Sequence, residues 1–176
     1  MEHTLERTLL YHPGVKLLTG MVSLLFSMLF VTGMVLSLLD GRYNSRQYIF
    51  TYIFSSVIGI MFATMLLFIV TCISSLVIMI VNTTFSMRNL FCVVYCYYGK
   101  SILLNSILLY LFYLGKEVNT GMTIAVYLLF TLLFLVQYYQ DTVKCAGVKK
   151  TAAMLLLGVT LLVNLVVIVP RVIIYI

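Results

Sequence analysis

Long uninterrupted apolar runs dominate this chain of 176 residues. Leu17–Leu39 contains 23 residues without a charge, and Tyr48–Met87 contains forty. A helix of about 20 apolar residues crosses a hydrocarbon core roughly 30 Å thick. Only 9% of the residues are charged, whereas a soluble domain has about 25%, so the chain has too few charges to cover a water-soluble core. These runs predict an integral membrane protein.

The continuity of the runs decides between the two structures that can span a bilayer. Helices and closed barrels alone satisfy every backbone hydrogen bond within hydrocarbon, and barrel strands alternate apolar and polar residues over short segments. The chain shows continuous runs instead, so we expect an all-α membrane helical bundle with about five transmembrane helices. The predicted parts are an N-terminal interfacial segment, 1–16, and a transmembrane domain, 17–176, with spans at about 17–39, 48–80, 90–115, 122–139 and 151–169.

The run Tyr48–Met87 is too long for one ordinary span. As a single straight helix it would measure about 60 Å at 1.5 Å per residue. It contains either two short helices with a tight turn, or one long tilted helix that ends near Ile80. We favour the long helix, because the polar residues at 82–84 disfavour helix and make Val81–Asn89 a natural connection.

The formal charge of +6 comes from basic residues that are spread singly along the chain. They form no basic patch, so the expected partner is the lipid bilayer with its anionic headgroups and not nucleic acid. With five spans, six Lys or Arg lie on the side of the N-terminus and four on the other side, Lys100 left aside. This difference predicts a multi-pass protein with a cytoplasmic N-terminus.

The acidic residues bear on transport and on catalysis. All five are expected in termini or loops: Glu2, Glu6, Asp40, Glu117 and Asp141. Ion-coupled transporters and intramembrane hydrolases usually place ionisable groups within the bilayer. The chain also shows no Gly-rich phosphate loop and no Ser with a plausible His base. We therefore expect no enzyme, no catalytic residue and no bound cofactor.

The cysteines offer a weak metal signal. Cys92 and Cys96 share a helix face at i and i+4, but zinc would need further ligands. The histidines, His3 and His12, lie near the N-terminus. We interpret the cysteines as small packing residues and expect no metal.

Lys100 is the one charge expected inside a span, and it has two interpretations. Buried in the bilayer it would cost roughly 2.5–3.5 kcal/mol on insertion scales and would mark a functional site. Alternatively Gly99 breaks the helix, Leu90–Tyr98 lies along the interface, and Lys100 extends to the headgroups from the start of a short span. We favour the break, because no acidic partner is expected within the spans.

Small and amide side chains predict helix contacts. Small residues recur at four-residue spacing in three sets: Thr19, Ser23 and Ser27; Gly33 and Ser37; Gly59 and Ala63. Such spacing allows helices to approach closely. Asn105 and Asn164 are placed to hydrogen-bond across helices, and we favour packing over ligand binding for both. Lys100 and Asn105 together remain the candidate intramembrane polar site.

Three segments carry a resemblance to a known family. They are Leu10–Lys16 (LYHPGVK), Asn82–Val94 (NTTFSMRNLFCVV) and Ala146–Gly158 (AGVKKTAAMLLLG). In order and content they resemble the Yip1 domain family over most of the chain. The resemblance implies a five-span, non-enzymatic membrane protein of the prokaryotic type, since the long N-terminal extension of eukaryotic members is not seen. Eukaryotic members are associated with vesicle traffic and small GTPases.

Three functional hypotheses follow. The first is a Yip1-like scaffold or accessory component that contacts lipid, other membrane proteins or itself. The second is a small permease or solute-binding subunit in which Lys100 binds an anionic group. The third is an immunity or resistance protein that shields the membrane from a peptide. A polar cavity lined by Lys100 and Asn105 would favour the permease over the scaffold.

Overall fold

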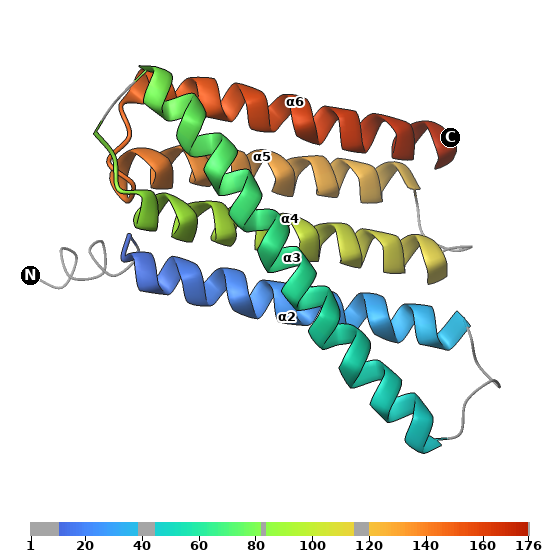
Figure 1. The fold of residues 1–176 in the computed structure, drawn as a ribbon. Helices are drawn as coiled ribbons and strands as arrows, with labels where there is room; N and C mark the ends of the chain where they lie inside the picture. Colours follow the sequence, from blue (N-terminus) through green and yellow to red (C-terminus); the bar gives the residue numbers. More distant parts are fainter. Residues whose placement is uncertain (1–10, 39–44, 82–83, 115–119, 176) are drawn as a thin grey trace, which may run out of the picture.

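The computed structural model describes residues 11–38, 45–81, 84–114 and 120–175. Within these ranges every regular element is an α-helix (Figure 1). The helices follow in the order α2 (Pro13–Leu38), α3 (Ser45–Val81), α4 (Met87–Leu114), α5 (Thr120–Lys144) and α6 (Lys150–Tyr175). The predicted all-α helical bundle is confirmed.

Four helices, α2 to α5, are long and apolar enough to cross a membrane by length and composition. A shorter apolar helical stretch, Lys150–Leu162, forms the first half of α6. The chain is therefore a multi-pass membrane protein.

Four helices form one layer and the fifth crosses it. In Figure 1, α2, α4, α5 and α6 lie side by side in that order, and α3 runs diagonally over them. Helix α3 contacts α2, α4 and α6. Helices α2, α4 and α6 begin at the end of the bundle where α3 and α5 finish. We call this the basic end, after the residues Lys16, Arg88, Lys144, Lys149 and Lys150.

The long apolar run forms a single helix. Helix α3 has 37 residues and continues without a break to Val81, which is about 55 Å at 1.5 Å per residue. Helix α3 runs diagonally across the other helices, and its first turns extend beyond α2 (Figure 1). The prediction of one long helix is confirmed; of the polar connection, residues 82 and 83 lie outside the described part.

Helix α2 begins earlier than the predicted span. His12 caps its first turn, since its Nδ1 accepts a hydrogen bond from the Gly14 amide at 3.2 Å and its carbonyl accepts one from Val15 at 3.1 Å. Pro13 suits the first helical position, where an amide hydrogen would have no intrahelical partner. Lys16 therefore lies within α2, whereas the predicted span began at Leu17. Positions 1–10 of the predicted interfacial segment lie outside the described residues.

A close contact between α2 and α4 forms the centre of the bundle. A Cβ atom built on Gly99 would lie 2.7 Å from the Gly20 carbonyl oxygen. A Cβ atom built on Gly20 would lie 2.7 Å from the backbone carbonyl oxygen of Tyr95. Seven residues further along both helices, the buried hydroxyls of Ser27 and Ser106 are hydrogen-bonded at 2.6 Å. The two helices are thus parallel and in register through small residues.

The same contact explains why α4 is continuous. Gly99 lies inside a helix of 28 residues, where its missing side chain lets two backbones meet. The prediction that Gly99 breaks this helix is wrong. In a membrane bundle, glycine within a helix allows a neighbouring helix to pack closely against it.

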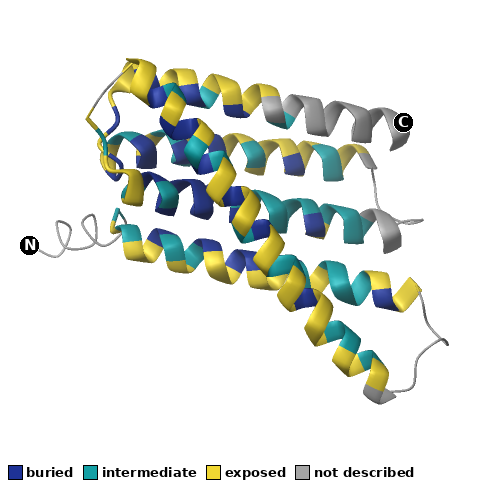
Figure 2. Cartoon of the chain, in the orientation of Figure 1, coloured by how far each residue is buried: buried dark blue, intermediate teal, exposed yellow. Residues whose placement is uncertain are grey.

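The packed core lies toward the basic end. Figure 2 shows buried residues gathered in the first half of α4 and the second half of α5. One cluster joins four helices there, with Ile78, Leu90, Val94, Tyr138 and Leu156 among its members. The outward faces of the helices, and of α3 above all, present large apolar side chains, as a protein surrounded by lipid requires.

The connection between α5 and α6 is fastened to the start of α4. Gly147 adopts a φ of 74°, the left-handed conformation common just after a helix. The Ser86 amide donates to the Ala146 carbonyl at 3.2 Å, and Asn89 Nδ2 donates to the Cys145 carbonyl at 3.0 Å. The ends of three helices are thereby held together at the basic end.

Candidate functional site

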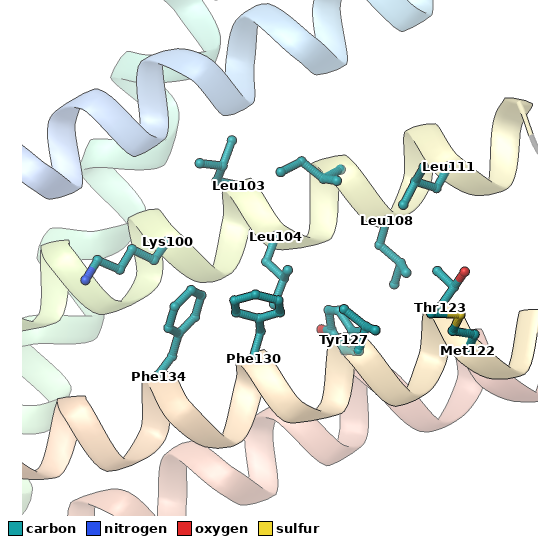
Figure 3. A pocket seen from close by; sticks show the side chains of 12 residues that line it. Lys100, Leu103, Leu104, Leu108, Leu111, Met122, Thr123, Tyr127, Phe130 and Phe134 are labelled. Atoms are coloured by element: carbon teal, nitrogen blue, oxygen red, sulfur yellow. The ribbon is translucent and has the colours of Figure 1, made fainter.

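Lys100 lies at the middle of α4 and its side chain leads toward the start of that helix (Figure 3). Its Nζ donates a hydrogen bond to Oε1 of Gln137 on α5 at 3.0 Å. The same nitrogen lies 5.8 Å from the ring centroid of Phe134, within the range of a cation–π contact. Lys100 is therefore a half-buried charge in the middle of a continuous helix, and it does not follow a helix break as the sequence favoured.

Beyond Lys100 an open groove of about 510 Å³ runs between α4 and α5. Its volume lies within the roughly 300–1,000 Å³ typical of small-molecule sites. Its lining is predominantly apolar and comes from both helices: Lys100, Leu103, Leu104, Ile107, Leu108 and Leu111 on α4, and Met122, Thr123, Val126, Tyr127, Phe130 and Phe134 on α5. Figure 3 shows Lys100 and Phe134 at one end and Leu111 and Met122 at the other. We call this the α4–α5 groove.

A second, much smaller cavity lies on the other side of the Lys100 side chain. It measures about 10 Å³ and its lining includes Lys100, Gln137 and Asp141. A cavity of about this size holds one water molecule when polar groups surround it. The polar end of the groove thus has room for a very small group.

A buried ion pair completes the polar cluster. Lys16 Nζ on α2 lies 2.7 Å from Asp141 Oδ2 on α5, and the two side chains are 6% and 5% exposed. Lys16 Nζ also lies 5.7 Å from the Tyr11 ring centroid, while Lys144 Nζ donates to the Tyr11 hydroxyl at 2.9 Å. Since Gln137 and Asp141 are four residues apart, α5 presents both polar groups on one face.

Sequence reasoning missed this pair. Asp141 lies inside α5, which continues to Lys144, beyond the predicted end of the span at 139. The expectation that every carboxylate lies in a terminus or loop is therefore wrong. The spacing of Gln137 and Asp141 on one helical face was the available signal, but it became visible only once the helix was known to extend this far.

The structure separates the two predicted site residues. Asn105 Nδ2 donates to the Ser101 carbonyl at 2.7 Å, and its Oδ1 accepts from the Tyr127 hydroxyl at 3.1 Å. Asn105 does not line the α4–α5 groove, whereas Lys100 does. Asn164 donates to the Tyr97 hydroxyl at 2.8 Å. Asn105 therefore links α4 to α5 and Asn164 links α6 to α4, so both amides hydrogen-bond across helices, as expected.

The cysteines are packed within the protein. Cys92, Cys96 and Cys145 are buried. Burial raises the pKa of the Cys145 thiol, in the connection between α5 and α6, and the nearby Asp141 carboxylate adds to the effect. In the part of the chain that the structure describes, no three His, Cys, Asp or Glu residues are grouped to hold a metal ion.

Comparisons with known proteins add no family. No protein-family model matches the chain, and no curated protein or solved structure shows significant similarity to it. The resemblance to the Yip1 domain stays a prediction. What the site can do follows from its geometry alone.

That geometry suits binding within the membrane. A half-buried ammonium group lies at the end of an apolar groove, and among the described residues no carboxylate lies within ion-pair distance of it. A charge in such surroundings is stabilised by an anionic partner. The groove is lined mostly by apolar side chains, and Lys100 is the charged residue of its lining.

Proposed function

We propose that this protein is a non-enzymatic accessory protein of the membrane that binds an amphiphile from the bilayer. The apolar chain of the ligand lies in the α4–α5 groove and its anionic group pairs with Lys100. The observation that carries this proposal is the position of Lys100, whose charge stands at one end of an otherwise predominantly apolar groove. The proposal develops the solute-binding alternative that the sequence suggested.

The energetics favour a charged ligand over a neutral one. Lys100 has three donors, and Gln137 accepts one of them. A hydrogen bond to a charged group contributes about 1.5–3 kcal/mol, which corresponds to roughly 10- to 100-fold in affinity, and an anionic acceptor also neutralises the half-buried ammonium group. Apolar contacts along the groove supply the remainder of the binding free energy.

A permease for polar solutes has less support. Such a function calls for a polar cavity lined by Lys100 and Asn105, but Asn105 lies outside the groove and most of the groove lining is apolar. The polar cavity beside Lys100 holds about 10 Å³. Recognition of a lipid-like molecule agrees better with these dimensions.

The test is the amphiphile that accompanies the protein on purification. The protein is extracted in a mild detergent, and native mass spectrometry counts the bound amphiphiles in the wild type and in Lys100→Met. We expect the variant to lose at least about tenfold in occupancy, because it keeps the stem of the side chain but removes the charge. Lys149→Met, which removes an exposed lysine outside the groove, is the matched control.

A second pair of variants tests the groove itself. Val126 lines the groove and Val159 lies on α6, and both side chains are 42% exposed. Tryptophan at position 126 should fill the groove and expel the ligand, whereas tryptophan at 159 should leave it bound. Equal occupancy in the wild type, Lys100→Met and Val126→Trp would refute the proposal.

A scaffold role, as the Yip1 resemblance implies, is the second candidate. The broad outer face of α3 favours it, where Phe50, Met61, Phe62 and Met65 are each more than 60% exposed. Such a face can contact another membrane protein as well as lipid. Partner binding through α3 would be insensitive to Lys100→Met, which distinguishes the two functions.

A further inference from the structure

The direction of the α4–α5 groove constrains how an amphiphile lies in it. The groove extends along α4 from Lys100 to Leu111, about 16 Å at 1.5 Å per residue. Half of a hydrocarbon core roughly 30 Å thick is about 15 Å. The groove is therefore as long as the chain region of one leaflet.

The position of the charge sets the polarity of the ligand. The Lys100 side chain leads toward the basic end (Figure 3). Its Nζ donates to Gln137 on α5. Gln137 lies seven residues before the end of α5 at Lys144, about 10 Å along the helix axis. An anionic group at Lys100 thus belongs to an amphiphile whose chain points away from the basic end, toward Leu111, three residues before the end of α4.

The space around Lys100 limits the size of the anionic group. The cavity beside it measures about 10 Å³ and the Phe134 ring lies against it on the groove side. A phosphodiester headgroup with its substituents needs far more room than one water molecule occupies. A carboxylate has no substituent beyond its two oxygens, so it is the smaller of the two groups.

The charges around the cavity point to a monoanion. Asp141 is paired with Lys16 at 2.7 Å, so these two charges balance. Lys100 then contributes one unbalanced positive charge beside the same cavity. One carboxylate neutralises this charge. A dianionic phosphate would leave one negative charge unpaired inside the protein, where desolvation of a charge costs free energy.

We infer that the ligand is a long-chain carboxylate of the fatty-acid type, held with its carboxylate at Lys100 and its methyl end near Leu111. This inference rests on the proposed function and narrows it to one chemical class. The groove opens along its side, so the molecule enters laterally from the bilayer.

The chain has no tryptophan, so one introduced indole reports binding without background. Leu111→Trp places it at the far end of the groove, and Val159→Trp on α6 is the control for contact with bulk lipid. Both proteins are reconstituted in phosphatidylcholine nanodiscs. They are titrated with a fatty acid that carries a nitroxide near its methyl end, and with the matched fatty alcohol.

We expect saturable quenching of Leu111→Trp by the carboxylate, at a concentration about tenfold lower than for the alcohol. A nitroxide near the carboxyl end should quench this indole less. Lys100→Met should abolish the difference between acid and alcohol, and Lys100→Arg, which keeps the charge if the Met variant fails to fold, should preserve it.

The possible failures are distinguishable. Saturable quenching at equal concentrations of acid and alcohol would overturn the carboxylate inference and leave amphiphile binding in place. Displacement of the fatty acid by phosphatidylglycerol at equal concentration would overturn the inference that the anionic group must be small. Quenching of Leu111→Trp no stronger than that of Val159→Trp, with either probe, would overturn the proposed function itself.

Discussion

Two charged side chains from opposite ends of the sequence stabilise each other inside the bundle. Lys16 and Asp141 are nearly inaccessible and lie 2.7 Å apart. Removal of one partner of a buried pair leaves an uncompensated charge, whereas replacement of both by apolar groups is often neutral. The pair therefore serves mainly to select which faces of α2 and α5 are turned inward.

A double-mutant cycle tests this interpretation. We expect Lys16→Met and Asp141→Leu each to lower the free energy of unfolding by about 3–5 kcal/mol, and the double variant to recover most of the loss. Unfolding is followed by circular dichroism in detergent. Additive losses in the double variant would show that the two charges act independently.

At the level of single residues, Lys100 was recognisable from the sequence but its partners were not. A lysine within a long apolar run stands out in any reading of the chain. Gln137 is an ordinary polar residue near the end of a predicted span, and only the packing of α4 against α5 makes it an acceptor for Lys100.

Among the helices, the contact between α2 and α4 depends on two glycines that face each other. A Cβ atom on Gly99 would lie 2.7 Å from the backbone oxygen of Gly20, and a backbone atom cannot move aside as a flexible side chain can. The two helices would have to separate, which would also strain the hydrogen bond between Ser27 and Ser106.

Gly99→Ala should therefore lower the free energy of unfolding by about 1–3 kcal/mol, the usual range for overpacking. Gly158→Ala is the matched control, because a Cβ atom there meets nothing within 4 Å. Alanine favours helix over glycine by roughly 0.5–1 kcal/mol, so this variant should be as stable as the wild type or slightly more so. Equal stability of both variants would refute the close contact.

For α3, the preference for one long helix over two short ones was correct. Forty uncharged residues followed by clustered polar ones left a long helix as the simplest solution, and the structure has it. The end of α5 was less predictable, because Gln140 and Asp141 look like the start of a loop until the partner of Asp141 on α2 is known.

For the molecule as a whole, the arrangement of helix ends predicts a topology. Arg88 and Lys149 are exposed at the basic end, and Gly121 is exposed at the opposite end. Single cysteines at these positions in a cysteine-free background should react with a membrane-impermeant reagent from opposite sides in sealed vesicles. Positions 88 and 149 should be cytoplasmic, since more Lys and Arg lie on that side.

Labelling of all three positions from one side would contradict a bundle that spans the membrane. Labelling of 88 and 149 from the outside would preserve the bundle and reverse its orientation. The native cysteines are removed because Cys145 lies beside the labelled loop, although the raised pKa of its thiol keeps it mostly protonated at neutral pH.

The sequence by itself determined the class of the protein, because unbroken apolar runs leave the backbone no partner in hydrocarbon except its own helix. It also favoured one long helix for α3 over two short ones, and it identified Lys100 as the charge to examine. Only the tertiary structure decided that Gly99 is a contact and not a break, that Asn105 lies apart from Lys100, and that Asp141 is buried. These depend on pairs of residues far apart in the chain, whose meeting is set by which helix faces pack together.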